Sequence, residues 1–330
     1  MADAMDGPKS AMLPDGRRLH LQHGPIDLVI DACGPPDEVA AAYRQALRRF
    51  RTVLLELVSE LGELRKPAGP ELSEEAFRGP TARRMARAVR VHAGAFVTPM
   101  AAVAGAVADE VLAALREGRL LARANVNNGG DIALHLAPGE SYAAGLVSRL
   151  DRPRPDGMCT ITHDMPVRGI ATSGRGGRSF SLGIADAVTV LARTAAAADA
   201  AATLIANAVT IDHAEIRRAA AETLDPDSDL GKLLVTTAVG RLDDDAVAAA
   251  LAGGVATAAR MRDSGLIHGA ALCLKEEYRV VGADLSGALP AMAQPDVDAL
   301  RRTYWSMISR FATRRKPGQQ QQTRSKGDQP

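Results

Sequence analysis

Three polar clusters interrupt an otherwise apolar stretch that runs from Asn125 to Asn207. Each cluster lies where a strand or a helix is expected to begin or end, and each carries residue types that bind anions or hard cations. The clusters are, in chain order, Asn128, Gly129, Gly130 and Asp131; then Thr172, Ser173, Gly174, Arg175, Gly176, Gly177, Arg178 and Ser179; then Asp199 and Thr203. This pattern is typical of a binding site assembled from several elements.

The first cluster places two glycines after two asparagines, between the apolar runs 121–126 and 132–136. Both residue types tolerate the positive φ angles of a tight turn, so the pattern predicts a strand, a turn and a second strand that begins with the carboxylate of Asp131. An ordinary hairpin built on Asn-Gly explains the same residues, and the residues alone favour it.

The second cluster offers three glycines, three hydroxyl groups and two arginines within eight residues. Successive backbone N–H groups can form a nest for phosphate, and guanidinium groups bind phosphate through paired hydrogen bonds. The cluster therefore predicts a phosphate-binding loop. A flexible basic loop has the same composition and is the alternative.

The third cluster lies in an alanine-rich run that predicts a helix. Asp199 and Thr203 are four residues apart, so the carboxylate and the hydroxyl lie on one face of this helix, one turn apart. Oxygen ligands placed in this way suit Mg²⁺. The alternative is a solvated helix face, although residues 195–206 offer little other polarity.

Together the clusters resemble the ApbE superfamily, whose best-known members are Mg²⁺-dependent FAD:protein FMN transferases. The resemblance covers residues 103–207, with Gly-Gly-Asp-Ile at 129–132, Ala-Thr-Ser-Gly at 171–174 and Ala-Asp-Ala at 198–200. It implies an α+β fold in which a mostly antiparallel sheet is packed with helices. It also implies FAD as a substrate or ligand, with Asp199 and Thr203 as the ligands of Mg²⁺.

Two positions depart from the transferases. Ala104 stands where they carry a lysine in a helix that ends in Asp, here at residues 103–109, and residues 179–186 replace their His-Ile-Asp-Pro stretch. The chain therefore resembles the uncharacterised branch of the superfamily more closely. Two functions stay open, and neither assigns a catalytic residue. One is Mg²⁺-dependent binding of flavin or another dinucleotide, with transferase or phosphoester-cleaving activity; the other is the same fold without flavin chemistry, acting on another small anionic metabolite.

The composition argues against several other classes of protein. A chain of 330 residues with 46% hydrophobic content can form a sizeable core. Aromatic residues make up only 3% and the net charge is +1, so we expect neither a nucleic-acid partner nor a charged membrane-binding surface. The three cysteines lack the spacing of a zinc or redox site, which is typical of a reducing compartment.

The N-terminal residues 1–15 carry acids and prolines before any apolar run. We therefore expect no secretory or lipoprotein signal and predict a cytoplasmic protein. The longest weakly polar run, 93–108, is shorter than the roughly 20 apolar residues of a membrane span. The expected partner is a small anionic molecule, and a homodimer is compatible with a protein of this size.

Hydrophobic periodicity and turn residues predict the elements that position the clusters. Strands are predicted at 17–23, 26–32, 121–126, 132–136, 143–150, 158–163 and 187–192, and a hairpin at 267–281. Helices are predicted at 36–64, 81–92, 100–116, 194–208, 214–223, 229–240, 243–263 and 295–314. The domain organisation predicted from these elements is a flexible segment 1–15, a single α+β domain at 16–315 and a disordered tail at 316–330. The arginines at 83, 84, 87 and 90 form a basic helix face that we expect to be solvated surface rather than a phosphate site.

Overall fold

The computed structural model describes residues 7–146, 157–177 and 179–282. The helix predicted at 295–314, the tail predicted at 316–330 and Arg178 lie outside these residues, as does the end of the strand predicted at 143–150.

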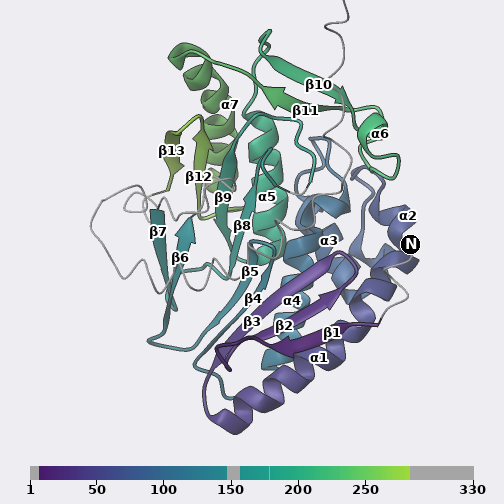
Figure 1. Ribbon diagram of the computed structural model, residues 1–330, viewed down its shortest axis with the longest axis vertical. Helices are drawn as coiled ribbons and strands as arrows, with labels where there is room; N and C mark the ends of the chain where they lie inside the picture. The colour runs from purple at the N-terminus through teal and green to yellow at the C-terminus, as the bar shows by residue number, and fades with distance from the viewer. Residues whose placement is uncertain (1–6, 147–156, 178, 283–330) are drawn as a thin grey trace, which may run out of the picture.

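In the described part of the chain, nine strands form one sheet in which every neighbouring pair is antiparallel (Figure 1). Its spatial order is β1 (Lys9–Met12), β2 (Leu19–His23), β3 (Ile26–Cys33), β4 (Arg123–Asn128), β5 (Asp131–Leu136), β8 (Gly169–Ser173), β9 (Ala187–Ala192), β12 (Gly269–Leu274) and β13 (Glu277–Val281). The predicted α+β class, with a mostly antiparallel sheet packed with helices, is confirmed.

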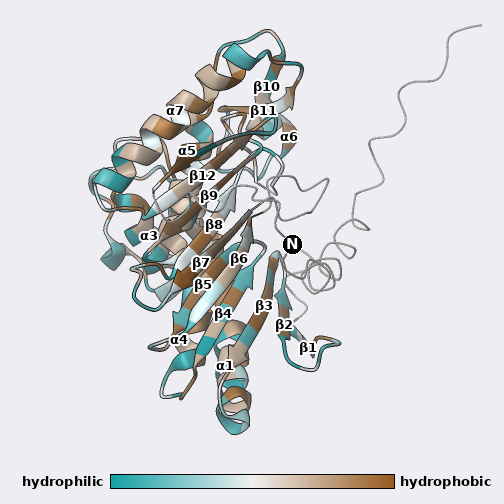
Figure 2. Ribbon diagram, turned by 90° about the vertical axis from the view of Figure 1, so that its left-hand side faces the viewer, coloured by the Kyte–Doolittle hydropathy of each residue, from teal (hydrophilic) through white to brown (hydrophobic). Residues whose placement is uncertain are grey.

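Helices cover one face of this sheet (Figure 2). The longer ones are α1 (Pro36–Ser59), α3 (Pro80–Arg90), α4 (Val103–Arg116), α5 (Ala195–Ala208) and α7 (Asp244–Asp263); the shorter ones are α2 (Leu61–Leu64), η2 (Glu74–Ala76) and η3 (Pro99–Ala102). Another short helix, α6 (Ala221–Leu224), lies apart from this layer. Alternate strand residues such as Ala171, Val188 and Val190 point into this layer and form the main hydrophobic core with the helices.

The opposite face of the sheet carries a separate hairpin formed by β6 (Ser141–Leu146) and β7 (Gly157–Thr162). Leu134, Ile170 and Leu191, which alternate with the residues of the main core, pack against this hairpin in a second core. The central strands β5, β8 and β9 are therefore covered on both faces.

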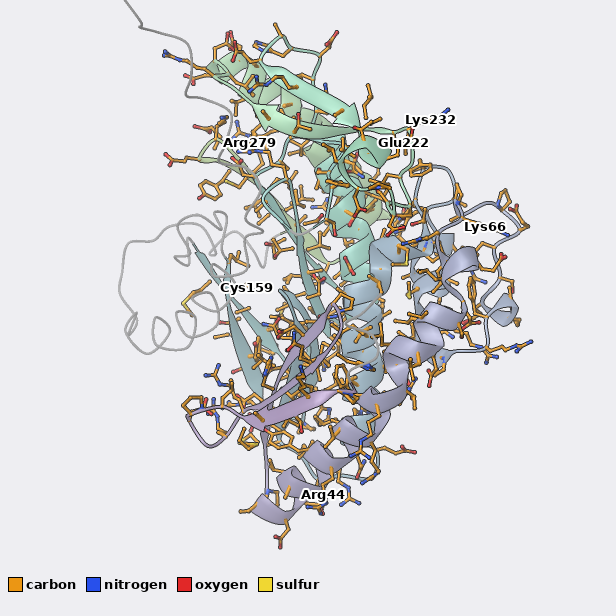
Figure 3. The ribbon with its side chains drawn as sticks, turned by 45° about the vertical axis from the view of Figure 1, so that its right-hand side comes forward. Arg44, Lys66, Cys159, Glu222, Lys232 and Arg279 are labelled. Carbon is orange, nitrogen blue, oxygen red and sulfur yellow. The ribbon has the colours of Figure 1, made fainter. Side chains whose placement is uncertain are left out.

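The region between α5 and α7 corrects two predictions. The helices predicted at 214–223 and 229–240 are mostly replaced by the paired strands β10 (Ile216–Ala220) and β11 (Leu234–Val239). Only the end of the first segment is helical, in the short helix α6 (Ala221–Leu224). Figure 3 shows Glu222 and Lys232, which lie in the connection between these two strands. Alanines in the first segment favour a helix, but Val235, Thr236 and Thr237 are β-branched and favour a strand, which pairs with β10.

Two more strands were not predicted. β1 lies within residues 1–15, which were predicted to be flexible, and its four residues pair with β2. β8 occupies the start of the second polar cluster, where a phosphate-binding loop was predicted, and pairs with β5 and β9 in the middle of the sheet. β8 depends on partner strands that are distant in sequence, which local patterns do not reveal. β1 pairs with the next strand along the chain, but its four residues are all exposed and carry no apolar alternation. Among the described helices, none is long and apolar enough to cross a membrane.

Candidate functional site

The first polar cluster forms the turn between β4 and β5. Gly129 and Gly130 have φ angles of +66° and +117°, which side chains other than glycine rarely adopt. Gly130 N donates to Asn127 Oδ1 at 2.8 Å, and Asn128 and Asp131 are directly opposed across the two strands. The predicted strand, turn and strand are confirmed, and the glycines have a structural reason to be there.

Asp131 connects this turn to the second cluster. Its Oδ1 accepts a hydrogen bond from Thr172 N at 3.2 Å, and the residue is only 9% exposed. Strand alternation places its side chain on the same face of β5 as Ala133, which belongs to the core beneath the helices. The carboxylate therefore lies on the helix side of the sheet.

Asp199 lies in α5 on that same side. Its Oδ2 accepts a hydrogen bond from Gly105 N, in the first turn of α4, at 3.0 Å. Burial is the largest cause that raises the pKa of the Asp199 carboxyl well above its ordinary value, and the charge of Asp131 raises it further. The backbone N–H groups of Gly105 and Ala104 act in the opposite direction without reversing the shift. The structure thus brings together two carboxylates from different clusters.

Asn128 binds the carbonyl oxygen of the Ala104–Gly105 peptide unit, whose N–H binds Asp199. Its Nδ2 donates to Ala104 O at 3.1 Å, while Asp199 accepts from the N–H of Gly105. Asn128 Oδ1 is buried and has no hydrogen-bond partner in the part of the chain that the structure describes. Buried polar atoms are rarely left without a partner, so this oxygen is available to a ligand or a water molecule.

The second predicted metal ligand, Thr203, is partly buried one helical turn after Asp199. The donor types fit Mg²⁺, because carboxylate, hydroxyl and amide oxygens are the ligands that hard cations prefer. Across residues 7–146, 157–177 and 179–282, no three His, Cys, Asp or Glu side chains lie together as a metal site. Mg²⁺ commonly takes only one or two protein carboxylates and fills its other positions with water and phosphate.

Side chains of the second cluster lie on both faces of the sheet. Thr172 Oγ1 lies 2.8 Å from Thr189 Oγ1 on the face that carries Ile170, opposite the face of Asp131 and Asp199. Strand alternation instead turns Ser173 toward the helix side. Only the backbone of Thr172 reaches Asp131, so the hydroxyl groups of this cluster do not all face one ligand.

Of the two arginines in the loop that follows β8, the structure describes Arg175. Gly174 has a φ of +152°, and Gly177 N donates to Gly174 O at 3.1 Å, closing a tight turn. Arg175 Nη2 donates to Asp186 Oδ1 at 2.6 Å. The next residue, Gly176, is exposed. Arg178 lies outside the described residues, and Ser179 is exposed. The predicted phosphate-binding role of these residues stays a prediction.

Sequence patterns missed two residues that support the site. Asp109, in α4, accepts hydrogen bonds from Ala195 N at 3.1 Å and Ala196 N at 2.9 Å, which caps the first turn of α5. Asp186 accepts from the Arg175 side chain. Each partner is more than ten residues away, so neither spacing nor periodicity could have identified these contacts. The signal for Asp109 was its place at the end of the ApbE-like run 103–109.

The capping carboxylate makes protein stability depend on pH. Burial raises the pKa of Asp109 from 3.8 to about 6, against the opposing effect of the two backbone N–H groups. Between these values the folded protein keeps the proton while the unfolded chain releases it, so stability falls as the pH rises from about 4 to about 6. We expect Asp109→Asn to flatten this fall, by up to about 3 kcal/mol. Urea unfolding at several pH values checks this, and an identical pH dependence in both proteins would contradict it.

Two arginines of α3 form ion pairs, and a third donates to a backbone carbonyl. Arg84 Nε lies 2.8 Å from Glu110 Oε2, and Arg83 Nε donates to Phe77 O at 2.7 Å. Arg87 pairs with Glu74. These contacts agree with the expectation of a structural, solvent-facing helix face rather than a phosphate site.

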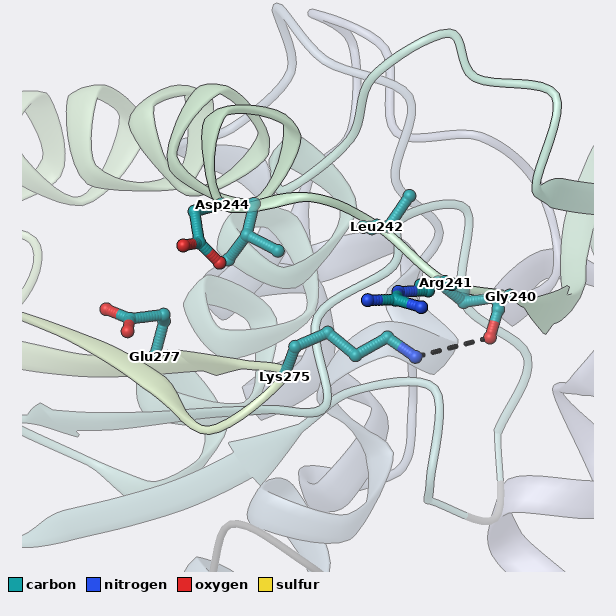
Figure 4. A pocket seen from close by; sticks show the side chains of 8 residues that line it. Gly240, Arg241, Leu242, Asp244, Lys275 and Glu277 are labelled. Carbon is teal, nitrogen blue, oxygen red and sulfur yellow. Dashed lines mark hydrogen bonds between the residues drawn. The ribbon is translucent and has the colours of Figure 1, made fainter.

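A shallow pocket of about 450 Å³ lies between the segment that joins β11 to α7 and the turn that joins β12 to β13. Figure 4 shows Asp244 and Glu277 on one side of this pocket and Arg241 and Lys275 on the other. Lys275 Nζ donates to Val239 O at 3.3 Å. Acidic and basic side chains are balanced here, so the lining selects no single sign of ligand charge.

Comparison with known proteins supplies relatives over part of the chain. A UPF0280 protein of Methanothermobacter thermautotrophicus is 41% identical over 134 residues, which are 38% of this chain and 46% of the relative. A UPF0280 protein of Methanosphaerula palustris is 39% identical over 142 residues, or 40% of this chain and 54% of the relative. The chain thus spans about half the length of the curated relatives it matches.

Solved structures of low sequence identity are also similar. The ApbE protein of Thermotoga maritima is 14% identical with a TM-score of 0.35, covering 62% of this chain and 87% of that one. The flavinyl transferase ApbE of Pseudomonas stutzeri is 13% identical with a TM-score of 0.38, covering 87% and 99%. The model of the protein family described as AbpE bacteria matches residues 10–280. Because that match covers most of the chain, the protein belongs to the AbpE bacteria family, as the ApbE-like motifs predicted.

Proposed function

We propose that the protein binds FAD or a similar dinucleotide together with Mg²⁺, and that it transfers a part of this molecule or cleaves its phosphoester bond. The observation that carries the proposal is the pair of carboxylates, Asp131 and Asp199, placed on the helix side of the sheet. Burial is the largest cause that raises the pKa of Asp199, and the negative charge of Asp131 raises it further. A divalent cation offsets such a shift by neutralising both charges.

In this proposal Asp199 and Thr203 hold the cation, with Asp131 beside them. Bound Mg²⁺ would neutralise negative charge that grows on a phosphate during transfer or cleavage. The Arg175 guanidinium and the backbone of Gly176 and Gly177 would bind the phosphate groups of the dinucleotide.

A second function is supported by other observations. Ala104 stands in place of the lysine of the transferases, and Asp199 already accepts a hydrogen bond from Gly105 N. Both favour a protein that has kept the fold without flavin chemistry and that binds another small anionic metabolite at the same place. Ligand screening separates the two functions.

FAD is expected to raise the melting temperature of the purified protein, because a ligand that binds only the folded state stabilises it by mass action. At a ligand concentration 100 times the dissociation constant, the free energy of unfolding rises by about 2.7 kcal/mol. This corresponds to a rise in melting temperature of roughly 5 °C for a protein of this size. A thermal unfolding titration with FAD, FMN and ATP, each with and without Mg²⁺, measures this.

The dependence on Mg²⁺ is the internal control in that titration. A shift with FAD that requires Mg²⁺ supports the proposed function. An unchanged melting temperature with all three compounds, with and without Mg²⁺, would refute the dinucleotide proposal and leave the second function.

A further inference from the structure

Asp186 lies at the base of the loop formed by residues 174–177, which we call the Arg175 loop. Its carboxylate accepts two hydrogen bonds of 2.6 Å, one from Arg175 Nη2 to Oδ1 and one from Lys275 N to Oδ2. A single side chain therefore joins the guanidinium of the loop to the turn between β12 and β13.

Asp186 is itself held firmly. Its backbone N donates to Cys273 O at 2.9 Å, and its side chain is only 15% exposed. Gly174 packs so closely that a Cβ atom there would lie 2.5 Å from Asp186 O. In addition, Arg175 N donates to Ala185 O at 2.9 Å. Both ends of the Arg175 to Asp186 ion pair are thus fixed by the backbone.

The guanidinium keeps capacity for a second partner. Its side chain is 34% exposed, and within the described residues Asp186 is the acceptor of its side-chain hydrogen bond. A guanidinium carries five N–H donors, so the remaining ones can bind an anion. An arginine that is already ordered loses less conformational entropy when it binds than a free one does.

We infer that Asp186 is a positioning residue, which holds the Arg175 guanidinium in the orientation that receives a phosphate group of the ligand. This inference rests on the proposed function. Asp186 touches no phosphate itself, because a carboxylate there would repel one; it acts through Arg175. In the alternative, Asp186 only anchors the β12–β13 turn through Lys275 N, where Lys275 and Glu276 adopt φ angles of 51° and 68°.

A double-mutant cycle distinguishes the two roles. Asp186→Asn keeps the size of the side chain and removes its charge, whereas Arg175→Lys keeps the charge and removes the planar fork. Calorimetric titration measures the affinity of the wild type, both single variants and the double variant for two probes, FAD with Mg²⁺ and inorganic pyrophosphate. Asp31→Asn is the matched control, because Asp31 Oδ2 accepts from Arg17 Nη2 at 2.9 Å in a part of the sheet remote from the loop.

Each single variant is expected to bind about tenfold more weakly, and the double variant no more weakly than Arg175→Lys alone, since Asp186 acts only through that guanidinium. The control should bind as the wild type does. Melting temperatures without ligand are measured in parallel, because a purely structural role would lower them without the coupling in affinity.

Four results would overturn the inference: unchanged affinity in Asp186→Asn, tighter binding in it, effects of the two substitutions that multiply independently, or no binding of either probe by the wild type. Tighter binding would mean that the carboxylate competes with the ligand for Arg175. If the wild type binds pyrophosphate but not FAD, the flavin proposal falls while the cycle still tests Asp186. If the wild type binds neither probe, both the proposed function and the role of Asp186 are refuted.

Discussion

Asp199→Asn is expected to weaken Mg²⁺-dependent binding of FAD by about 100-fold or more. Substituting residues that merely support metal ligands already costs about 10–100-fold, and this substitution removes the charged ligand itself. The fold should persist, because the amide oxygen can still accept the hydrogen bond that Gly105 N donates at 3.0 Å. Calorimetric titration of Mg²⁺, with and without FAD, measures the loss.

Thr203→Val is expected to act in the same direction and more mildly, because a neutral hydroxyl binds a hard cation less strongly than a carboxylate does. Thr257→Val is the matched control, since Thr257 is a helical threonine of α7 whose hydroxyl donates to Gly253 O at 3.0 Å. Equal dependence on Mg²⁺ in the wild type and Asp199→Asn would mean that Asp199 only anchors α4 to α5.

Gly105→Ala is expected to destabilise the protein by about 3 kcal/mol or more, in contrast to the stabilisation that this change usually brings in a helix. A Cβ atom at this position would lie 2.2 Å from Ala195 O and 2.6 Å from Ala196 N, so α4 and α5 would have to separate. That movement would also disturb the hydrogen bonds of Asp109 and Asp199. We expect the melting temperature to fall by about 5–10 °C.

Gly62→Ala is the control for this prediction. Gly62 also lies in a helix, α2, but nothing lies within 4 Å of the position that its Cβ would take. Its substitution should leave stability unchanged or raise it by up to about 1 kcal/mol. Similar melting temperatures for the two variants would show that the helices can adjust their spacing, and the close approach of α4 and α5 would not be required.

Local sequence patterns predicted those parts of the fold that local interactions specify. The glycines at 129 and 130 predicted the β4–β5 turn because they tolerate positive φ, and the structure has them there. The helical pattern predicted a helix at 194–208, and α5 spans Ala195–Ala208, where Thr194 Oγ1 accepts from Ala197 N at 3.1 Å. It likewise predicted a helix at 243–263, and Asp243 accepts from Ala246 N at 2.8 Å at the start of α7.

Segments whose conformation depends on distant partners were predicted poorly. β8 forms because β5 and β9 lie on either side of it, and residues 214–240 form β10 and β11 because each strand supplies the hydrogen bonds of the other. Alanine is compatible with a helix or a strand in these segments, so its local preference was overridden by tertiary pairing.

The sequence by itself determined the turn residues, most helices, the candidate ligands Asp199 and Thr203 and the ApbE-like motifs, because each depends on residues within about one or two turns of each other. Only the tertiary structure decided which side chains meet. It placed Asp131 and Asp199 on the same side of the sheet, directed the Thr172 hydroxyl to the other side and paired Arg175 with Asp186. The Arg175–Asp186 contact joins residues 11 positions apart, and the Gly105–Asp199 contact joins residues 94 positions apart. Sheet pairing and helix packing bring such residues together, and no local spacing encodes them.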